Sequence, residues 1–141
     1  MALSRSIYHL LSTTAPLVAY TSQRVYPLIA PQSAKKTHIV FQQISGGRVH
    51  AMVNDPGFAL PRWQFDVWST DYRHMELSAE QLRKTLQDYS STSMGGSSGV
   101  PVTRILFEGE MDLSEIDQVT KKIYYRKSQD YFIPHTTDRG A

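Results

Sequence analysis

The residues that could bind a metal ion are the five histidines, which are scattered along the chain: His9, His38, His50, His74 and His135. A helical metal site needs two histidines four residues apart, and no pair here has that spacing. No acidic cluster accompanies any of the histidines. We therefore interpret them as surface or edge residues, and the sequence predicts no metal site and no cofactor.

The carboxylates that could act together in acid–base chemistry are Asp66 and Asp71. The residues between them alternate as a strand does, and an extended chain would hold the two carboxylates too far apart to share a proton. We expect Asp66 to be solvated or paired with an arginine instead. The sequence has no phosphate-binding glycine loop before a helix and no nucleophile beside a base. We therefore predict no catalytic residues and no enzyme activity.

A third chemical feature is a basic and aromatic segment, whose members are Lys121, Lys122, Tyr124, Tyr125, Arg126 and Lys127. Such segments bind RNA when aromatic rings stack on bases and cations contact phosphates. Strand alternation, however, places Lys121, Tyr125 and Lys127 on one face, and Lys122, Tyr124 and Arg126 on the other. This split favours an edge strand protected by lysines or one that meets a partner.

Size and composition restrict the class of protein. A chain of 141 residues with 40% hydrophobic and 20% charged residues is typical of one folded domain. The net charge of +2 is too small to indicate a nucleic-acid-binding surface. The absence of cysteine excludes disulfides, thiolate zinc sites and cysteine nucleophiles, and fits a reducing cytoplasm. No apolar run reaches the roughly 20 residues of a membrane span.

The elements that would position these groups are organised around Leu60 to Tyr89. Trp63, Phe65 and Val67 lie on one face and alternate with Arg62, Gln64, Asp66 and Trp68 on the other, which predicts a half-buried strand over Leu60 to Thr70. From Tyr72 to Tyr89 the apolar residues follow a helical stripe, although a capping box at Ser78 would allow a later start.

The other segments complete an α+β domain. Two short helical pieces over Ser4 to Ser12 and Thr14 to Tyr20, or one kinked helix, are expected, and then an extended piece over Val25 to Leu28. Strands are expected over Thr37 to Ser45, Val102 to Glu110 and Val119 to Ile133, with an acidic connection at Met111 to Gln118. The resulting αββαββ order predicts a mainly antiparallel sheet covered on one face by two helices.

The sequence predicts a single domain over residues 1–141 with two long loops and a mobile end. Residues 46–59 contain Asn54-Asp55-Pro56-Gly57, a strong turn signal, and are long for a hairpin connection, which fits either a binding loop or a mobile surface loop. Residues 90–101 are rich in glycine and serine, which favours a flexible loop or a simple linker. Residues 134–141 are polar and predict a mobile tail.

Several segments, taken in order, carry a resemblance to a known family. They are Arg24-Val25-Tyr26-Pro27, Ala30-Pro31-Gln32, the strand IVFQQIS, Trp63-Gln64-Phe65-Asp66-Val67-Trp68-Ser69, Asp71-Tyr72, a helix with Leu82-Arg83-Lys84-Thr85-Leu86, and the strand Tyr124 to Ile133. Together, over about Ile7 to Ile133, the chain resembles the tail completion proteins of long-tailed bacteriophages, also called tail terminators or tail-to-head joining proteins.

The resemblance implies a structural role without chemistry. It implies a virion protein, made in the bacterial cytoplasm, that ends the tail tube at its head-proximal end and joins the tail to the DNA-filled head. The implied partners are further copies in a ring of six, the tail tube protein and a head-completion connector, with phage DNA passing through the ring and no membrane or specific nucleic acid bound. A head-completion connector, a minor tail protein and an RNA-binding module remain alternatives.

Ring subunits need two different contact surfaces, because a head-to-tail contact joins unlike faces. We hypothesise that loops which order on assembly supply them, at Arg48 to Phe58 and Met94 to Val100. The candidate interface residues lie in these loops and on the basic strand: Arg48, His50, Asn54, Phe58, Met94, Lys121 and Arg126.

Overall fold

The structure is a computed structural model that describes residues 3–31, 36–46, 58–91, 93–95 and 99–136. The helices are α1 (Leu3–Thr13), α2 (Ala15–Thr21) and α3 (Tyr72–Leu86). The strands are β1 (Val25–Pro27), β2 (His38–Ser45), β3 (Phe58–Ala59), β4 (Arg62–Ser69), β5 (Leu106–Ile116), β6 (Ile123–Phe132) and β7 (His135–Thr136).

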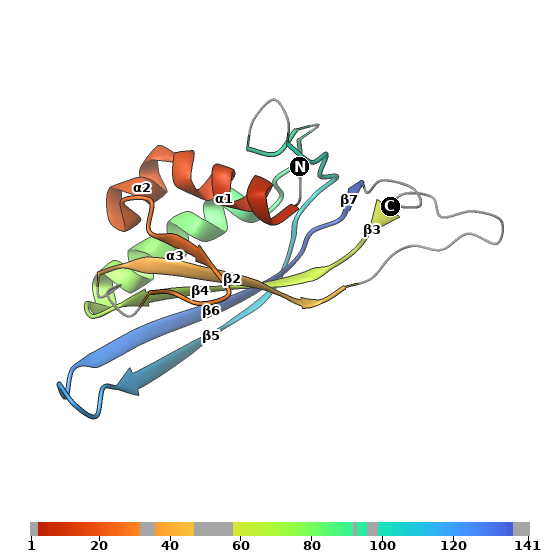
Figure 1. The fold of residues 1–141 in the computed structure, drawn as a ribbon. Helices are drawn as coiled ribbons and strands as arrows, with labels where there is room; N and C mark the ends of the chain where they lie inside the picture. The colour runs from red at the N-terminus through yellow and green to blue at the C-terminus, as the bar shows by residue number, and fades with distance from the viewer. Residues whose placement is uncertain (1–2, 32–35, 47–57, 92, 96–98, 137–141) are drawn as a thin grey trace.

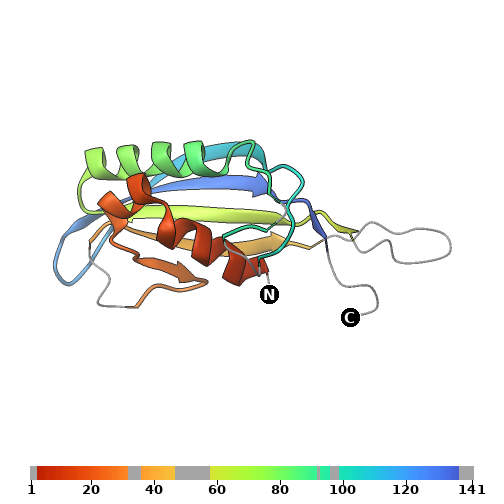
Figure 2. The same ribbon diagram turned by 90° about the horizontal axis from the view of Figure 1, so that it is seen from above.

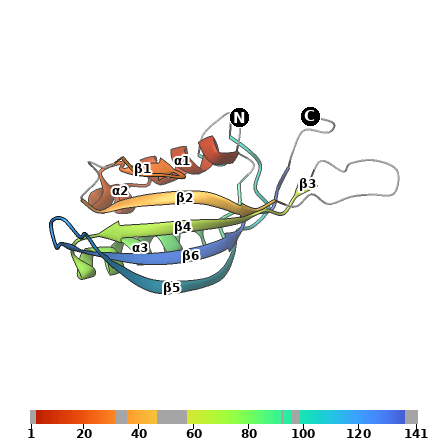
Figure 3. The same cartoon turned by 60° about the horizontal axis from the view of Figure 1, so that its bottom comes forward.

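The main sheet has the strand order β1-β2-β4-β6-β5. The pairs β2–β4, β4–β6 and β6–β5 are antiparallel, and only β1–β2 is parallel. The helices α1, α2 and α3 lie on one face of this sheet, and within the described residues no helix covers the other face (Figures 1 and 3). This confirms the predicted α+β class and the helix-covered sheet, with the first helix of the predicted order formed as the two pieces α1 and α2.

The helices lie over the sheet (Figure 2), and the buried core residues pack between these two layers. Alternation on β4 buries Trp63, Phe65 and Val67 toward the helices, as their spacing predicted. The helical stripe on α3 does the same with Met75, Ala79 and Leu82. Other large side chains that are fully buried among the described residues come from all three helices, β2, β6 and the chain between α3 and β5: Ile7, Leu11, Leu17, Ile39, Phe41, Leu86, Met94, Ile105 and Tyr131.

Helix α3 begins where the apolar stripe predicted and ends earlier. The Asp71 side chain accepts a hydrogen bond from the His74 N–H at 3.2 Å and caps the first turn. The alternative start at Ser78 is wrong, because the helix runs through Ser78 and buries it. At the other end, Asp88 has a left-handed φ of 62° and its N–H donates to the Ile105 carbonyl, which stops the helix before Tyr89.

Strand β5 differs most from the sequence prediction. The expected strand at Val102 to Glu110 is displaced: Val102 forms only isolated bridges, with Ser91 and His135, and the strand starts at Leu106. The expected acidic connection is wrong, since residues up to Ile116 extend the strand. The acidic side chains are tolerated because Asp112 pairs with Lys127 at 3.3 Å and Glu115 with Arg126 at 3.8 Å on β6.

The short pair β3–β7 also lies beyond the predicted αββαββ order, since two-residue strands have no detectable alternation. As a result, the C-terminal segment leaves the core later than predicted: Pro134 is buried and His135 belongs to β7. Residues 137–141 lie outside the described residues, as do residues 47–57 of the first predicted loop.

The described part of the second predicted loop is packed against α1. Met94 is fully buried in the core, and the Ser6 hydroxyl accepts a hydrogen bond from the Val100 N–H at 3.1 Å. Gly95 has a φ of +75°, and a Cβ there would lie 2.7 Å from the Ser6 carbonyl oxygen. Glycine is therefore required where this segment crosses the helix.

Candidate functional site

The face of the sheet away from the helices carries a row of polar side chains. They come from alternate positions of two neighbouring strands: Arg62, Gln64 and Asp66 on β4, and Arg126, Ser128 and Asp130 on β6. The register places Gln64 opposite Asp130 and Asp66 opposite Ser128. The side chains of the two strands can therefore contact each other across the pair. We call this set the open-face network.

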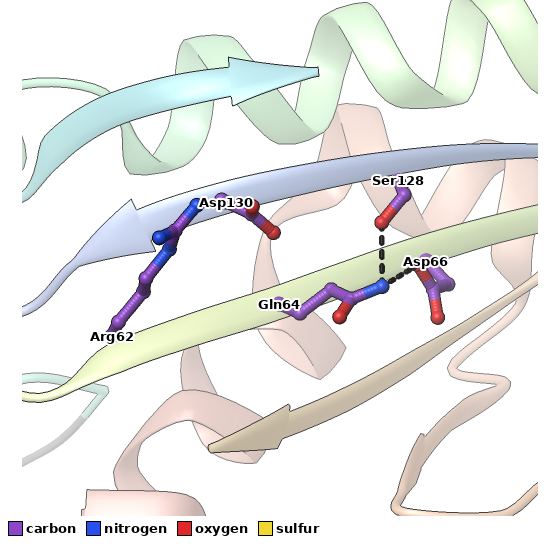
Figure 4. Close-up of polar contacts among 5 residues, drawn as sticks. All are labelled: Arg62, Gln64, Asp66, Ser128 and Asp130. Carbon is purple, nitrogen blue, oxygen red and sulfur yellow. Dashed lines mark hydrogen bonds and ion pairs between the residues drawn. The ribbon is translucent and has the colours of Figure 1, made fainter. Parts of the chain in front are cut away.

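The centre of the open-face network is Gln64. Its Nε2 donates to Asp66 Oδ1 at 3.0 Å and to Ser128 Oγ at 2.6 Å (Figure 4). At one end of the row, Arg62 Nη2 donates to Asp130 Oδ2 at 2.7 Å in a charge-assisted hydrogen bond. These contacts hold several side chains in fixed positions, although they lie on a sheet face without a helix.

Arg126 organises the other end of the network. Its guanidinium lies 3.6 Å from Asp66 and 3.8 Å from Glu115, and it stacks 5.2 Å from the Trp68 ring. His38 of β2 stacks on the same ring system at 6.3 Å with nearly parallel planes. Asp66 is thus paired with an arginine, as the sequence analysis allowed.

A cavity of about 390 Å³ adjoins this end of the network. Its floor includes His38, Asp66 and Trp68, and its wall is the apolar segment after β1: Leu28, Ile29, Ala30 and Pro31. Burial lowers the pKa of His38, assisted by the charge of Arg24, against a hydrogen bond to the Lys36 carbonyl that raises it. Asp66 accepts a hydrogen bond from Gln64 and forms an ion pair with Arg126, so the cavity offers mainly shape and stacking surface for binding.

The β5–β6 hairpin ends in a turn at one end of the sheet (Figure 1), and this end exposes apolar side chains. Val119 is 90% exposed, and Ile116 and Ile123 are about half exposed on the strands below it. The Asp117 carboxylate accepts from the Val119 and Thr120 N–H groups and shapes the turn. Exposed apolar groups at a defined turn are typical of a contact surface for another protein.

The predicted interface residues lie in different parts of the structure. Arg48, His50 and Asn54 are outside the described residues, and Phe58 is described only through its β3 backbone, which pairs with Thr136. Met94 is fully buried within the subunit, so its side chain is not presented to a partner. Lys121 lies in the exposed hairpin turn with a φ of 60°, and Arg126 belongs to the open-face network.

The basic and aromatic segment does not form one cationic face. Lys121 and Lys122 are exposed at the hairpin tip, Arg126 is paired on the open face, and Lys127 pairs with Asp112 on the helix side. Alternation predicted this split. The interpretation of the segment as an edge strand is wrong, because β6 lies between β4 and β5.

Sequence reasoning missed the partners within the open-face network. The alternation identified Arg62, Gln64 and Asp66 as one polar face, but the pairing of β4 with β6 has no local signal.

Within the described residues, no group of three or more histidine or acidic side chains could hold a metal ion. None of the helices in this part of the chain is long and apolar enough to cross a membrane.

Comparison with solved structures gives a match over nearly the whole fold. A chain from a structure described as "Virion of native gene transfer agent (GTA) particle" is similar with a TM-score of 0.73. The match covers 96% of this chain and 95% of that chain, at 13% sequence identity. No protein-family model and no curated protein matches the sequence. At this identity, the similarity shows that the two chains share a fold.

Proposed function

We propose that this chain is a phage virion structural protein that terminates the tail tube and joins the tail to the DNA-filled head. The observation that carries the proposal is the fold shared along 96% of this chain with a component of a virion particle. The sequence resemblance to tail completion proteins supports the same role. The protein would act by contact alone, as a non-enzymatic component at the head-proximal end of the tail.

The assembled form that we propose is a ring of six copies. A head-to-tail ring needs two unlike surfaces on each subunit. The open-face network with its adjoining cavity supplies one, and the apolar hairpin tip at Ile116, Val119 and Ile123 supplies another. The remaining contacts of the ring would be made with the tail tube protein on one side and a head-completion connector on the other.

Antibody labelling of intact particles tests the location. Gold-labelled antibody against the chain should mark one position per particle, at the junction of head and tail, and quantitative mass spectrometry should give six copies per particle. Label on the head shell or along the tail, or a copy number of one or of many dozens, would contradict the proposal. The separate heads and tails made by a phage deleted for the gene provide the unlabelled control.

A further inference from the structure

Strand β5 forms one edge of the main sheet and pairs only with β6 (Figure 3). It is 11 residues long, and along an antiparallel edge strand every second residue directs its N–H and C=O away from the sheet. About five residues therefore offer unpaired backbone groups in a row. Among the described residues, no other strand pairs with this side of β5.

The two edges of the sheet are built differently. The opposite edge, β1, has three residues and ends in Pro27, both of which are common ways to block strand addition. Strand β5 has no proline and no lysine, and its only register irregularity lies near its start, between Phe107 and Gly109. The β1 edge is thus closed to strand addition, while β5 is long and carries only a bulge near its start and acidic side chains as obstacles.

The charges of β5 are all of one sign: Glu108, Glu110, Asp112 and Glu115. If two copies paired through β5, carboxylates of one strand would lie next to carboxylates of the other, which destabilises a ladder. A second copy of the chain is therefore a poor occupant for this edge. A strand that carries lysine or arginine would be attracted to it instead.

The two faces of β5 define the pattern that an added strand would need. Glu110 faces the helices, where it accepts from Gln129 Nε2 at 3.2 Å, and Asp112 faces the same way toward Lys127. Met111 and Leu113 lie on the opposite, open face, where they are paired with Ser128 and Arg126. The Met111 side chain is 59% exposed. Further along the open face, Glu115 interrupts the apolar row and pairs with Arg126. Because strand side chains alternate, cations on one face and apolar side chains on the other would match residues 110–113 of β5.

We propose that β5 accepts an added strand from a different protein, an extended segment in which lysine or arginine alternates with apolar residues. Backbone hydrogen bonds to β5 give the affinity, and the alternation gives the selectivity, as in other cases of strand addition. This inference rests on the edge geometry and does not depend on the proposed function.

Titration with synthetic peptides tests the inference. The probe is a short acetylated peptide of alternating lysine and valine. One control has the same composition in two blocks, and the other has glutamate in place of lysine. In two-dimensional amide NMR spectra, the alternating peptide should shift β5 resonances and slow the hydrogen exchange of its outward amides, with a Kd on the order of 1 mM or tighter. Neither control should do so.

Matched charge variants separate the acidic edge from general electrostatics. The double variant E110Q/D112N should weaken binding of the alternating peptide by about tenfold. D71N removes one carboxylate from the α3 cap while leaving a capping side chain, and should leave binding unchanged. Equal binding of the block peptide, shifts that map away from β5, or no shift at any peptide concentration would overturn the inference.

Discussion

The most informative perturbation of the open-face network separates the Asp66–Arg126 pair. Asp66→Ala removes the carboxylate, which leaves the guanidinium near Trp68 with Glu115 at 3.8 Å as its remaining ion pair. Arg126→Met removes the positive charge but keeps an apolar stem over the Trp68 ring. The double variant D66A/R126M removes both charges and completes a double-mutant cycle.

The expected magnitude follows from the burial of the two side chains. The Asp66 and Arg126 side chains are 11% and 22% exposed, and the charged atoms lie 3.6 Å apart. Breaking a fully buried pair costs about 3–5 kcal/mol and an exposed pair about 0–1 kcal/mol. For this partly buried pair we expect each single variant to lose about 2 kcal/mol, or about 5–8 °C in Tm for a domain of this size. The coupling energy should be about 1–2 kcal/mol.

Urea unfolding of the wild type and the three variants measures the coupling. The exposed pair Arg104–Asp88, with side chains 63% and 55% exposed, is the matched control and should give a coupling below about 0.5 kcal/mol. Raising the salt concentration should change the control coupling more than that of Asp66–Arg126. Single-variant losses that add within about 0.5 kcal/mol would refute the account of the open-face network.

Three further predictions concern groups elsewhere in the fold. Gln129→Leu should lower the free energy of unfolding in urea by about 2–3 kcal/mol, because the buried Tyr131 hydroxyl loses its hydrogen-bond acceptor at 2.7 Å. Adding Tyr131→Phe to this variant should recover about 1 kcal/mol. If nothing is recovered, the hydroxyl is not left without a partner. Because burial lowers the pKa of His38 in the folded protein, the unfolded chain binds a proton at a higher pH than the folded chain does. The contribution of His38 to the free energy of unfolding is therefore complete above about pH 6.5 and falls as the pH is lowered further. His38→Gln should flatten this dependence, and an unchanged pH profile of the urea midpoint would contradict it. Gly95→Ala should lower stability by about 1–3 kcal/mol, because its φ of +75° and the contact of the new Cβ with Ser6 are both unfavourable. Gly109→Ala is the control and should cost little, because the new Cβ would lie in open space. Similar losses of the two variants in thermal melts would count against this prediction.

The sequence predicted those elements whose periodicity is regular. The alternation of Trp63, Phe65 and Val67 and the stripe through Met75 and Leu82 identified β4 and α3 and the face that each buries. It did not predict that β5 continues through Asp112 and Glu115. Acidic residues are unfavourable in strands by propensity, and only the cations on β6 make them acceptable there.

The candidate site was predicted in part. Arg62, Gln64 and Asp66 were recognised as one polar face, because that information is local. Their partners on β6 depend on which strands become neighbours, and local patterns do not specify strand order. Met94 shows the same limit: its glycine- and serine-rich surroundings are typical of a flexible loop, yet a packing site near α1 buries it.

Reconstitution of head–tail joining tests the proposed function most directly. The purified protein is added to tails that lack their terminal ring, together with DNA-filled heads, and the mixture is examined by electron microscopy and plated for infectivity. The account predicts joined, infectious particles in the presence of the protein and separate heads and tails in its absence. Tails that remain unjoined, with the folded protein free in solution, would contradict it.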